Sequence, residues 1–239
     1  MTQLAPSPAP ATPRGYDVTL PQNLPSEDNE NMDSPWHRSQ IDLLINVLET
    51  NWKGRNFYCG GNMFIYFSTE HIRNRDFRGP DFYVVLDVDH DRPRDYWAVW
   101  EEKGRYPNLI IELLSPTTAR EDVTTKKDIY ERTFGTGEYF CYDPDGRKLL
   151  GWRLKRRYQA IPFEGERMWS EELEMWIGPW TGNWEGHDMI WLRFFDREGK
   201  MLPTGEEKEA ARACAAEAEV ERLRRELEAI RRQSIDANQ

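Results

Sequence analysis

The sequence lacks the features that would place the chain in a membrane or outside the cell. Its 239 residues contain no apolar run of about 18, the length that a membrane-spanning helix needs. The first fifteen residues contain no apolar segment of the kind found in secretory signals. Cysteine is scarce, and Cys59, Cys141 and Cys214 are too widely spaced to predict a disulfide framework or a zinc site. We therefore expect no membrane contact and a reducing, cytoplasmic setting.

Positive charge is also in short supply. The chain has 32 Lys and Arg against 42 Asp and Glu, a net charge of −10, whereas non-specific nucleic-acid binders are normally basic. The deficit is unevenly spread, because residues 1–35 carry one Arg against five acidic residues and residues 205–239 carry seven basic against nine acidic ones. Residues 36–204 retain a net charge of only −4. Composition alone therefore does not exclude a nucleic-acid substrate.

Two terminal segments flank a predicted domain. Residues 1–35 hold seven of the fifteen prolines and almost no aromatic or branched apolar residues, which predicts a disordered arm. Residues 205–239 follow the break at Pro203 and are typical of a helical, coiled-coil-like tail, because apolar residues recur at spacings of three and four. These residues are Ala213, Ala216, Val220, Leu223, Leu227 and Ile230. The tail is compatible with a homo-oligomer or a protein partner and equally with a helix packed on its own domain or lying in solvent, and its small alanines argue against a strong dimer seam.

Residues 36–204 carry the patterns of a mixed α/β (α+β) domain. Apolar spacing predicts a helix over residues 36–52, and a second helix over residues 125–135 connects the third and fourth strands. The predicted strands lie within residues 57–68, 78–88, 108–115, 138–146 and 148–154. The third of them is almost continuously apolar, so we expect it at the centre of the sheet. The Trp-rich residues 156–202 add strands whose order the sequence does not predict.

Three residues on these elements have the chemistry of a metal-dependent hydrolase. Asp81 opens a strand after Pro80, and Glu112 interrupts an apolar strand where a carboxylate needs a partner. Two converging carboxylates can hold a hard divalent cation, and a lysine such as Lys126 can orient the attacking water or stabilise charge on a phosphate. The alternatives are structural, because a Pro-Asp pair commonly marks a turn and a strand glutamate can pair with an arginine.

The residues that surround these three resemble those of a known family. The match runs through Pro80-Asp81, the stretch from Glu112 to Thr118, Asp122 with Lys126 and Tyr130, and Glu138-Tyr139. Together they resemble the Uma-type restriction endonuclease family, within the PD-(D/E)XK nuclease superfamily, over about residues 40–200. The resemblance implies a restriction-endonuclease-like mixed sheet flanked by helices, with the active site at one edge.

The resemblance also implies residue roles. Asp81 and Glu112 match the ligands of Mg²⁺ (or Mn²⁺), and Lys126 matches a catalytic lysine that has moved to the following helix. Leu114 occupies the position where the superfamily normally has this lysine. Lys127 is the fallback, since only one of two neighbouring helix residues can face the site well. Asp122 is expected to cap the helix, with a supporting contact to the site as the alternative.

The resulting function hypothesis is a Mg²⁺-dependent endonuclease that hydrolyses DNA phosphodiester bonds. A basic cluster within residues 147–157 would contact the phosphate backbone. The alternative interpretation is that these residues form only an exposed face of the sheet. The competing hypothesis is a catalytically inactive protein that keeps the nuclease fold and acts through its C-terminal helix. The two differ in whether substitution of Asp81 or Lys126 changes DNA cleavage.

Overall fold

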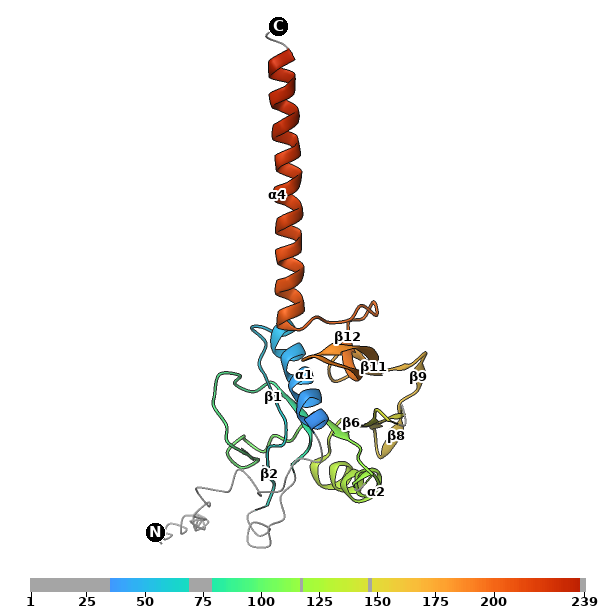
Figure 1. The fold of residues 1–239 in the computed structure, drawn as a ribbon. Coiled ribbons are helices and arrows are strands. Elements are labelled where there is room, and N and C mark those ends of the chain that lie inside the picture. Colours follow the sequence, from blue (N-terminus) through green and yellow to red (C-terminus); the bar gives the residue numbers. More distant parts are fainter. Residues whose placement is uncertain (1–34, 69–78, 117, 146–147, 237–239) are drawn as a thin grey trace, which may run out of the picture.

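The computed structural model describes residues 35–68, 79–116, 118–145 and 148–236. The predicted disordered arm, residues 1–35, lies outside these segments except for its last residue, which begins helix α1 (Pro35–Asn51). Figure 1 shows a folded body of strands and helices from which the C-terminal helix α4 (Gly205–Asp236) projects. Among the helices described, none combines the length and the apolar composition that crossing a bilayer would require.

Six strands form the main sheet in the spatial order β1-β3-β5-β6-β7-β8. They are β1 (Phe57–Gly60), β3 (Phe82–Leu86), β5 (Leu109–Leu113), β6 (Glu138–Asp143), β7 (Lys148–Leu154) and β8 (Tyr158–Ala160). The central strands β5 and β6 are parallel, and every other neighbouring pair is antiparallel. The predicted mixed sheet with β5 at its centre and a helix between β5 and β6 is therefore confirmed.

Two smaller sheets complete the body. Strands β9 (Phe163–Glu164), β10 (Arg167–Ser170), β11 (Met175–Trp184) and β12 (His187–Phe195) form an antiparallel sheet in the order β12-β11-β10-β9. The strand expected over residues 57–68 is divided, because β2 (Ile65–Tyr66) leaves the main sheet and pairs with β4 (Trp97–Ala98). β4 was not predicted, because a strand of two residues is too short to show an alternation of apolar and polar residues.

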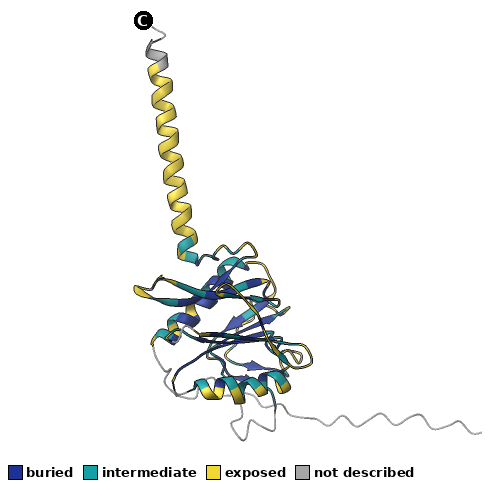
Figure 2. Cartoon of the chain, turned by 90° about the vertical axis from the view of Figure 1, so that its right-hand side faces the viewer, coloured by how far each residue is buried: buried dark blue, intermediate teal, exposed yellow. Residues whose placement is uncertain are grey.

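The alternation of side chains along the main sheet produces two cores. Leu109, Ile111 and Leu113 of β5 face one core, which also contains the apolar side of α1 and residues of the second sheet. Ile110 of β5 faces the opposite core, where Tyr130 and the β2–β4 pair lie. Successive strand residues point to opposite faces, so Glu112 lies on the second side with Ile110. Figure 2 shows the buried residues gathered in this strand-rich body.

The helix between β5 and β6 is longer than expected and irregular. It runs through α2 (Ala119–Glu121), η2 (Asp122–Lys126), α3 (Lys127–Ile129) and η3 (Tyr130–Phe134), where η2 and η3 are π-helical turns. The sequence prediction placed its start at residue 125, whereas the Ser115 hydroxyl accepts the Thr118 N–H and the helix begins soon after. It ends as predicted at Gly135, whose φ of 65° is left-handed.

The start of α4 is fixed to the domain. The Glu207 carboxylate accepts the Thr204 N–H, and Thr204 Oγ1 accepts the Glu207 N–H, which is a reciprocal capping box. The fully buried Arg193 of β12 donates to both oxygens of Glu207, and the Gly205 N–H donates to Asn46 of α1. Burial alone would raise the pKa of Glu207, but these hydrogen bonds hold it below its ordinary value. The helix therefore leaves the domain from a charged, capped anchor.

The close approach of β3 to α1 depends on Gly61. A Cβ at this position would lie 2.1 Å from Ile41 Cγ2 and 2.6 Å from the Asp81 carbonyl oxygen. We expect Gly61→Ala to lower the free energy of unfolding by about 1–3 kcal/mol, because the backbone around Asp81 must shift. Denaturant unfolding measures this change. Gly205→Ala is the control, since its nearest neighbour would be at 3.4 Å and it should be nearly neutral. Equal effects of the two substitutions would contradict the packing described.

Candidate active site

Glu112 is a fully buried carboxylate in the middle of the central strand. Its Oε1 accepts a hydrogen bond from the Tyr130 hydroxyl at 2.8 Å. Its Oε2 accepts one from Lys126 Nζ at 3.1 Å and a longer one, 3.4 Å, from the Asp81 N–H. The sequence predicted that this carboxylate needs a partner, and the structure provides it with three hydrogen-bond donors.

Asp81 lies beside Glu112 because of strand register. β3 and β5 are antiparallel with Phe82 opposite Ile111, so the residue before Phe82 comes opposite Glu112. The Asp81 carboxylate accepts the Leu113 N–H at 2.7 Å, which fixes it to the end of β5. Unlike Glu112, Asp81 keeps part of its surface exposed. The two carboxylates predicted to act together are therefore neighbours, one buried and one at the edge.

Lys126 reaches the carboxylates from the helix that follows β5. Its Nζ lies 3.1 Å from Glu112 Oε2 and 2.8 Å from Asp122 Oδ1, and its side chain is 21% exposed. Lys127 points elsewhere, because its Nζ lies over the rings of Trp152 and Tyr158. Of the two neighbouring lysines, only Lys126 contacts the carboxylates. The structure thus brings Asp81, Glu112 and Lys126 together, and their catalytic roles stay predictions.

Two further side chains complete the cluster, and the sequence reasoning assigned them no firm role. Asp122 was expected to cap the helix, but it lies within the helix, is 1% exposed and makes its ion pair with Lys126. The prediction of a cap was wrong, and the alternative of a supporting contact describes what the structure shows. Tyr130 is also fully buried and holds Glu112. The sequence signal for Tyr130 was its position in the motif that resembles the family.

Charge in this cluster is unbalanced, because three carboxylates share one ammonium group. Burial raises the pKa of Glu112 to about 8; Lys126 opposes this rise, and the neighbouring Asp81 and Asp122 add to it. Burial also raises the pKa of Asp81, to about 6. Burial alone would lower the pKa of Lys126, but Glu112 and Asp122 raise it above its ordinary value. The ammonium therefore stays charged, and the carboxylates favour an added proton or cation.

The donor set of this cluster fits Mg²⁺ or Mn²⁺. Hard divalent cations take oxygen ligands, and Mg²⁺ is commonly bound through one or two carboxylates while water and phosphate supply the rest. Asp81 and Glu112 provide two such carboxylates with raised pKa values, which a nearby cation would lower. Within the described segments, no three His, Cys, Asp or Glu side chains are arranged to hold a metal ion by themselves. The cluster therefore suits a cation that shares its ligands with water and substrate.

Other side chains that could bind a metal or a phosphate lie away from this cluster and make structural contacts. His90, in an acidic loop, lies against Glu49 and the Phe57 carbonyl oxygen. Cys141 is buried in the second core. Within the predicted basic cluster, Arg147 lies outside the described residues and Arg153 is held between Glu138 and Glu171. Arg153 is therefore paired with carboxylates, and the phosphate-binding surface expected for the basic cluster stays a prediction.

One protein family matches more than half of this chain. A model of the family Uma2, described as "Putative restriction endonuclease", matches residues 29–179. This match confirms the family resemblance, with limits that differ from the expected residues 40–200. The chain is also similar to a crystal structure titled "putative nuclease belonging to DUF820", from Anabaena variabilis ATCC 29413, with 17% sequence identity. The matched region covers 55% of this chain and 69% of the other protein's chain, and the TM-score is 0.41. At that score the likeness supports no conclusion. No curated protein matches the chain significantly.

The raised pKa of Glu112 predicts a pH-dependent stability. Its folded-state pKa of about 8 exceeds the ordinary value of 4.5, so the folded protein binds the extra proton and loses stability as pH rises between these values. In EDTA, Glu112→Gln should raise the free energy of unfolding by about 1–3 kcal/mol at pH 8 and by much less at pH 5. Thermal or denaturant unfolding at both pH values measures this difference.

Glu121→Gln, at an exposed position on the helix that follows β5, controls for the loss of a carboxylate as such. The interpretation is contradicted if Glu112→Gln destabilises the protein at pH 8 as much as at pH 5.

Proposed function

The chain belongs to the Uma2 family, and from that premise we propose that it is an endonuclease that hydrolyses DNA phosphodiester bonds with Mg²⁺ or Mn²⁺. The observation that carries the proposal is the contact of Lys126 with Glu112, next to Asp81. Two carboxylates from neighbouring strands and one ammonium from a helix suit the hydrolysis of a phosphate ester. A hydrolytic nuclease is also what the family description suggests.

Each side chain has a separate task in this proposal. Asp81 and Glu112 would hold the cation, which supplies Lewis-acid activation of water and neutralises charge at the scissile phosphate. Lys126 would orient the attacking water or stabilise negative charge on the phosphate, since its ammonium is partly exposed. Tyr130 and Asp122 act as positioning residues, because one fixes Glu112 and the other fixes Lys126. The exposed edges of Asp81 and Lys126 mark the side from which DNA would approach.

A basic loop beside the same helix supports DNA as the substrate. Lys155, Arg156 and Arg157 are exposed between β7 and β8. Arg157 pairs with Glu131, which belongs to the helix that carries Lys126. We propose that this loop contacts the phosphate backbone. Because the chain as a whole is acidic, the resulting binding should be weak and strongly sensitive to salt. A reducing, cytoplasmic setting agrees with three free cysteines and stays part of the proposal.

The alternative is an inactive nuclease-fold protein that acts through α4. A degenerate site would be expected to have lost a member, whereas Asp81, Glu112 and Lys126 are all present and in contact or adjacent. The exposed apolar row of α4 is compatible with either function. The enzyme is therefore the better supported of the two, and a cleavage assay separates them.

Substitution of the two neighbouring lysines provides the test. We expect Lys126→Ala to lower the rate of plasmid cleavage in Mg²⁺ or Mn²⁺ by at least about 100-fold, because a charged group at the reacting phosphate is lost. Lys127→Ala removes the same charge from the next residue and should change the rate only a few-fold. Asp81→Ala should be as inactive as Lys126→Ala. EDTA should abolish cleavage by the wild type.

Circular dichroism and thermal unfolding establish first that each variant is folded. Equal cleavage by the wild type, Asp81→Ala and Lys126→Ala would remove the proposed roles. Absence of any metal-dependent cleavage by the folded wild type on varied DNA substrates would favour the interaction protein.

A further inference from the structure

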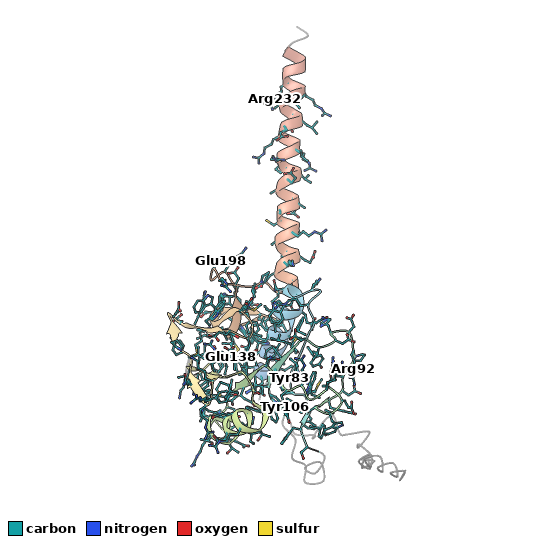
Figure 3. All side chains as sticks on the ribbon, turned by 180° about the vertical axis from the view of Figure 1, so that it is seen from behind. Tyr83, Arg92, Tyr106, Glu138, Glu198 and Arg232 are labelled. Atoms are coloured by element: carbon teal, nitrogen blue, oxygen red, sulfur yellow. The ribbon has the colours of Figure 1, made fainter. Side chains whose placement is uncertain are left out.

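The outer part of α4 presents a continuous apolar row to solvent. Every described residue from Lys208 to Arg232 is exposed, and the helix contacts the domain only at its start (Figure 2). The larger apolar side chains are 46–59% exposed; they are Val220, Leu223, Leu227 and Ile230. Figure 3 shows Arg232 near the far end of the helix, well away from Glu138 and Tyr83 in the domain. Nothing within the described residues covers this row.

We propose that this row joins a second copy of the chain in a parallel, in-register two-stranded coiled coil. The apolar residues alternate at spacings of three and four, which defines the core positions a and d of a heptad repeat. Position a is held by Ala213, Val220 and Leu227, and position d by Ala216, Leu223 and Ile230. Val220 at a with Leu223 at d favours two strands, whereas Leu227 at a with Ile230 at d is a combination that favours larger bundles. The alanines leave room for close approach near the domain.

Charge complementarity identifies the partner as a second copy. In a parallel pair, each residue at position g faces the residue at position e of the following heptad on the other helix. Here the three facing pairs are Arg212 with Glu217, Glu219 with Arg224, and Glu226 with Arg231, each across the two chains. All three are oppositely charged, and two-fold symmetry repeats each of them. Such a pattern is self-complementary.

The same charges disfavour an antiparallel pair. In that arrangement, position g faces position g and position e faces position e, so alignment of the six apolar residues would set Glu219 against Glu226 and Glu217 against Arg224 of the other chain. The repulsion of the first pair cancels the attraction of the second, whereas every facing pair of the parallel arrangement is attractive. Like charges facing each other destabilise a helix pair. In the single chain, several of the charged residues are satisfied only by exposed pairs along the helix, such as Glu219 with Arg222. These pairs contribute little and leave the charges available.

The anchor at the base of α4 makes a short coiled coil feasible. The seam spans less than three heptads, and isolated helices of that length are marginal in water because nucleation is costly. Here the first turn is already formed by the capping box of Thr204 and Glu207 and by Arg193. The 32 residues of α4 then extend about 48 Å from this fixed start. Parallel pairing places both domains at the same end of the assembly.

Sedimentation equilibrium of the full chain tests the assembly. We expect a mass of twice 28.3 kDa at high micromolar concentration, falling toward one chain on dilution. Leu223→Glu combined with Leu227→Glu should give a monomer at all concentrations. Ala218→Glu combined with Ala229→Glu adds the same charge on the outer face and should leave the dimer in place. A wild-type monomer throughout, or a dimer that survives the leucine substitutions, would overturn the proposal.

Charge-swapped chains test the orientation. One variant carries Glu219→Arg and Glu226→Arg, and the other carries Arg224→Glu and Arg231→Glu. Each alone should be monomeric, because like charges then face each other across the seam, and an equimolar mixture should form heterodimers at wild-type concentrations. Restored association in the mixture also shows that each variant chain is folded. Association of the first variant alone at wild-type strength, or no association in the mixture, would contradict parallel pairing.

Discussion

A carboxylate in the middle of the central strand is the constraint on which the surrounding structure depends. Glu112 is fully buried, and a buried charge is tolerated only when other groups compensate for the lost water. The compensation comes from two parts of the chain: the backbone N–H of Asp81, next to β3, donates to Glu112, and the following helix brings Lys126 and Tyr130. The first π-helical turn of this helix carries both Asp122 and Lys126.

Much of the main sheet and the residues of the cluster could be predicted from the sequence. β-forming runs revealed β3, β5 and β6, and a glutamate inside an apolar run revealed Glu112. The rest depended on tertiary contacts. Asp122 near a helix start looks like a cap in sequence, whereas in the folded chain it is buried and pairs with Lys126. The order of strands β9 to β12 could not be predicted, because the long strands β11 and β12 show no regular alternation of buried and exposed residues.

The domain and the helix α4 differ in how their charged residues are arranged. The domain concentrates carboxylates around one lysine, which creates an excess of negative charge at a single place. The helix α4 distributes acidic and basic residues along both sides of an apolar row, where they nearly cancel. Arg193 and Glu207 connect these regions through a partly buried ion pair. The net charge of −10 therefore describes neither region and is a poor guide to the partners of this chain.

The central claim is that the excess negative charge of the cluster is matched by a divalent cation held by Asp81 and Glu112. Calorimetric titration of Mn²⁺ or Mg²⁺ into the wild type and into Glu112→Gln tests it without reference to any substrate. The account predicts binding to the wild type and an affinity at least about tenfold lower for Glu112→Gln, since a ligand and its charge are lost. Equal affinities for the two proteins, or no binding to the folded wild type, would contradict it.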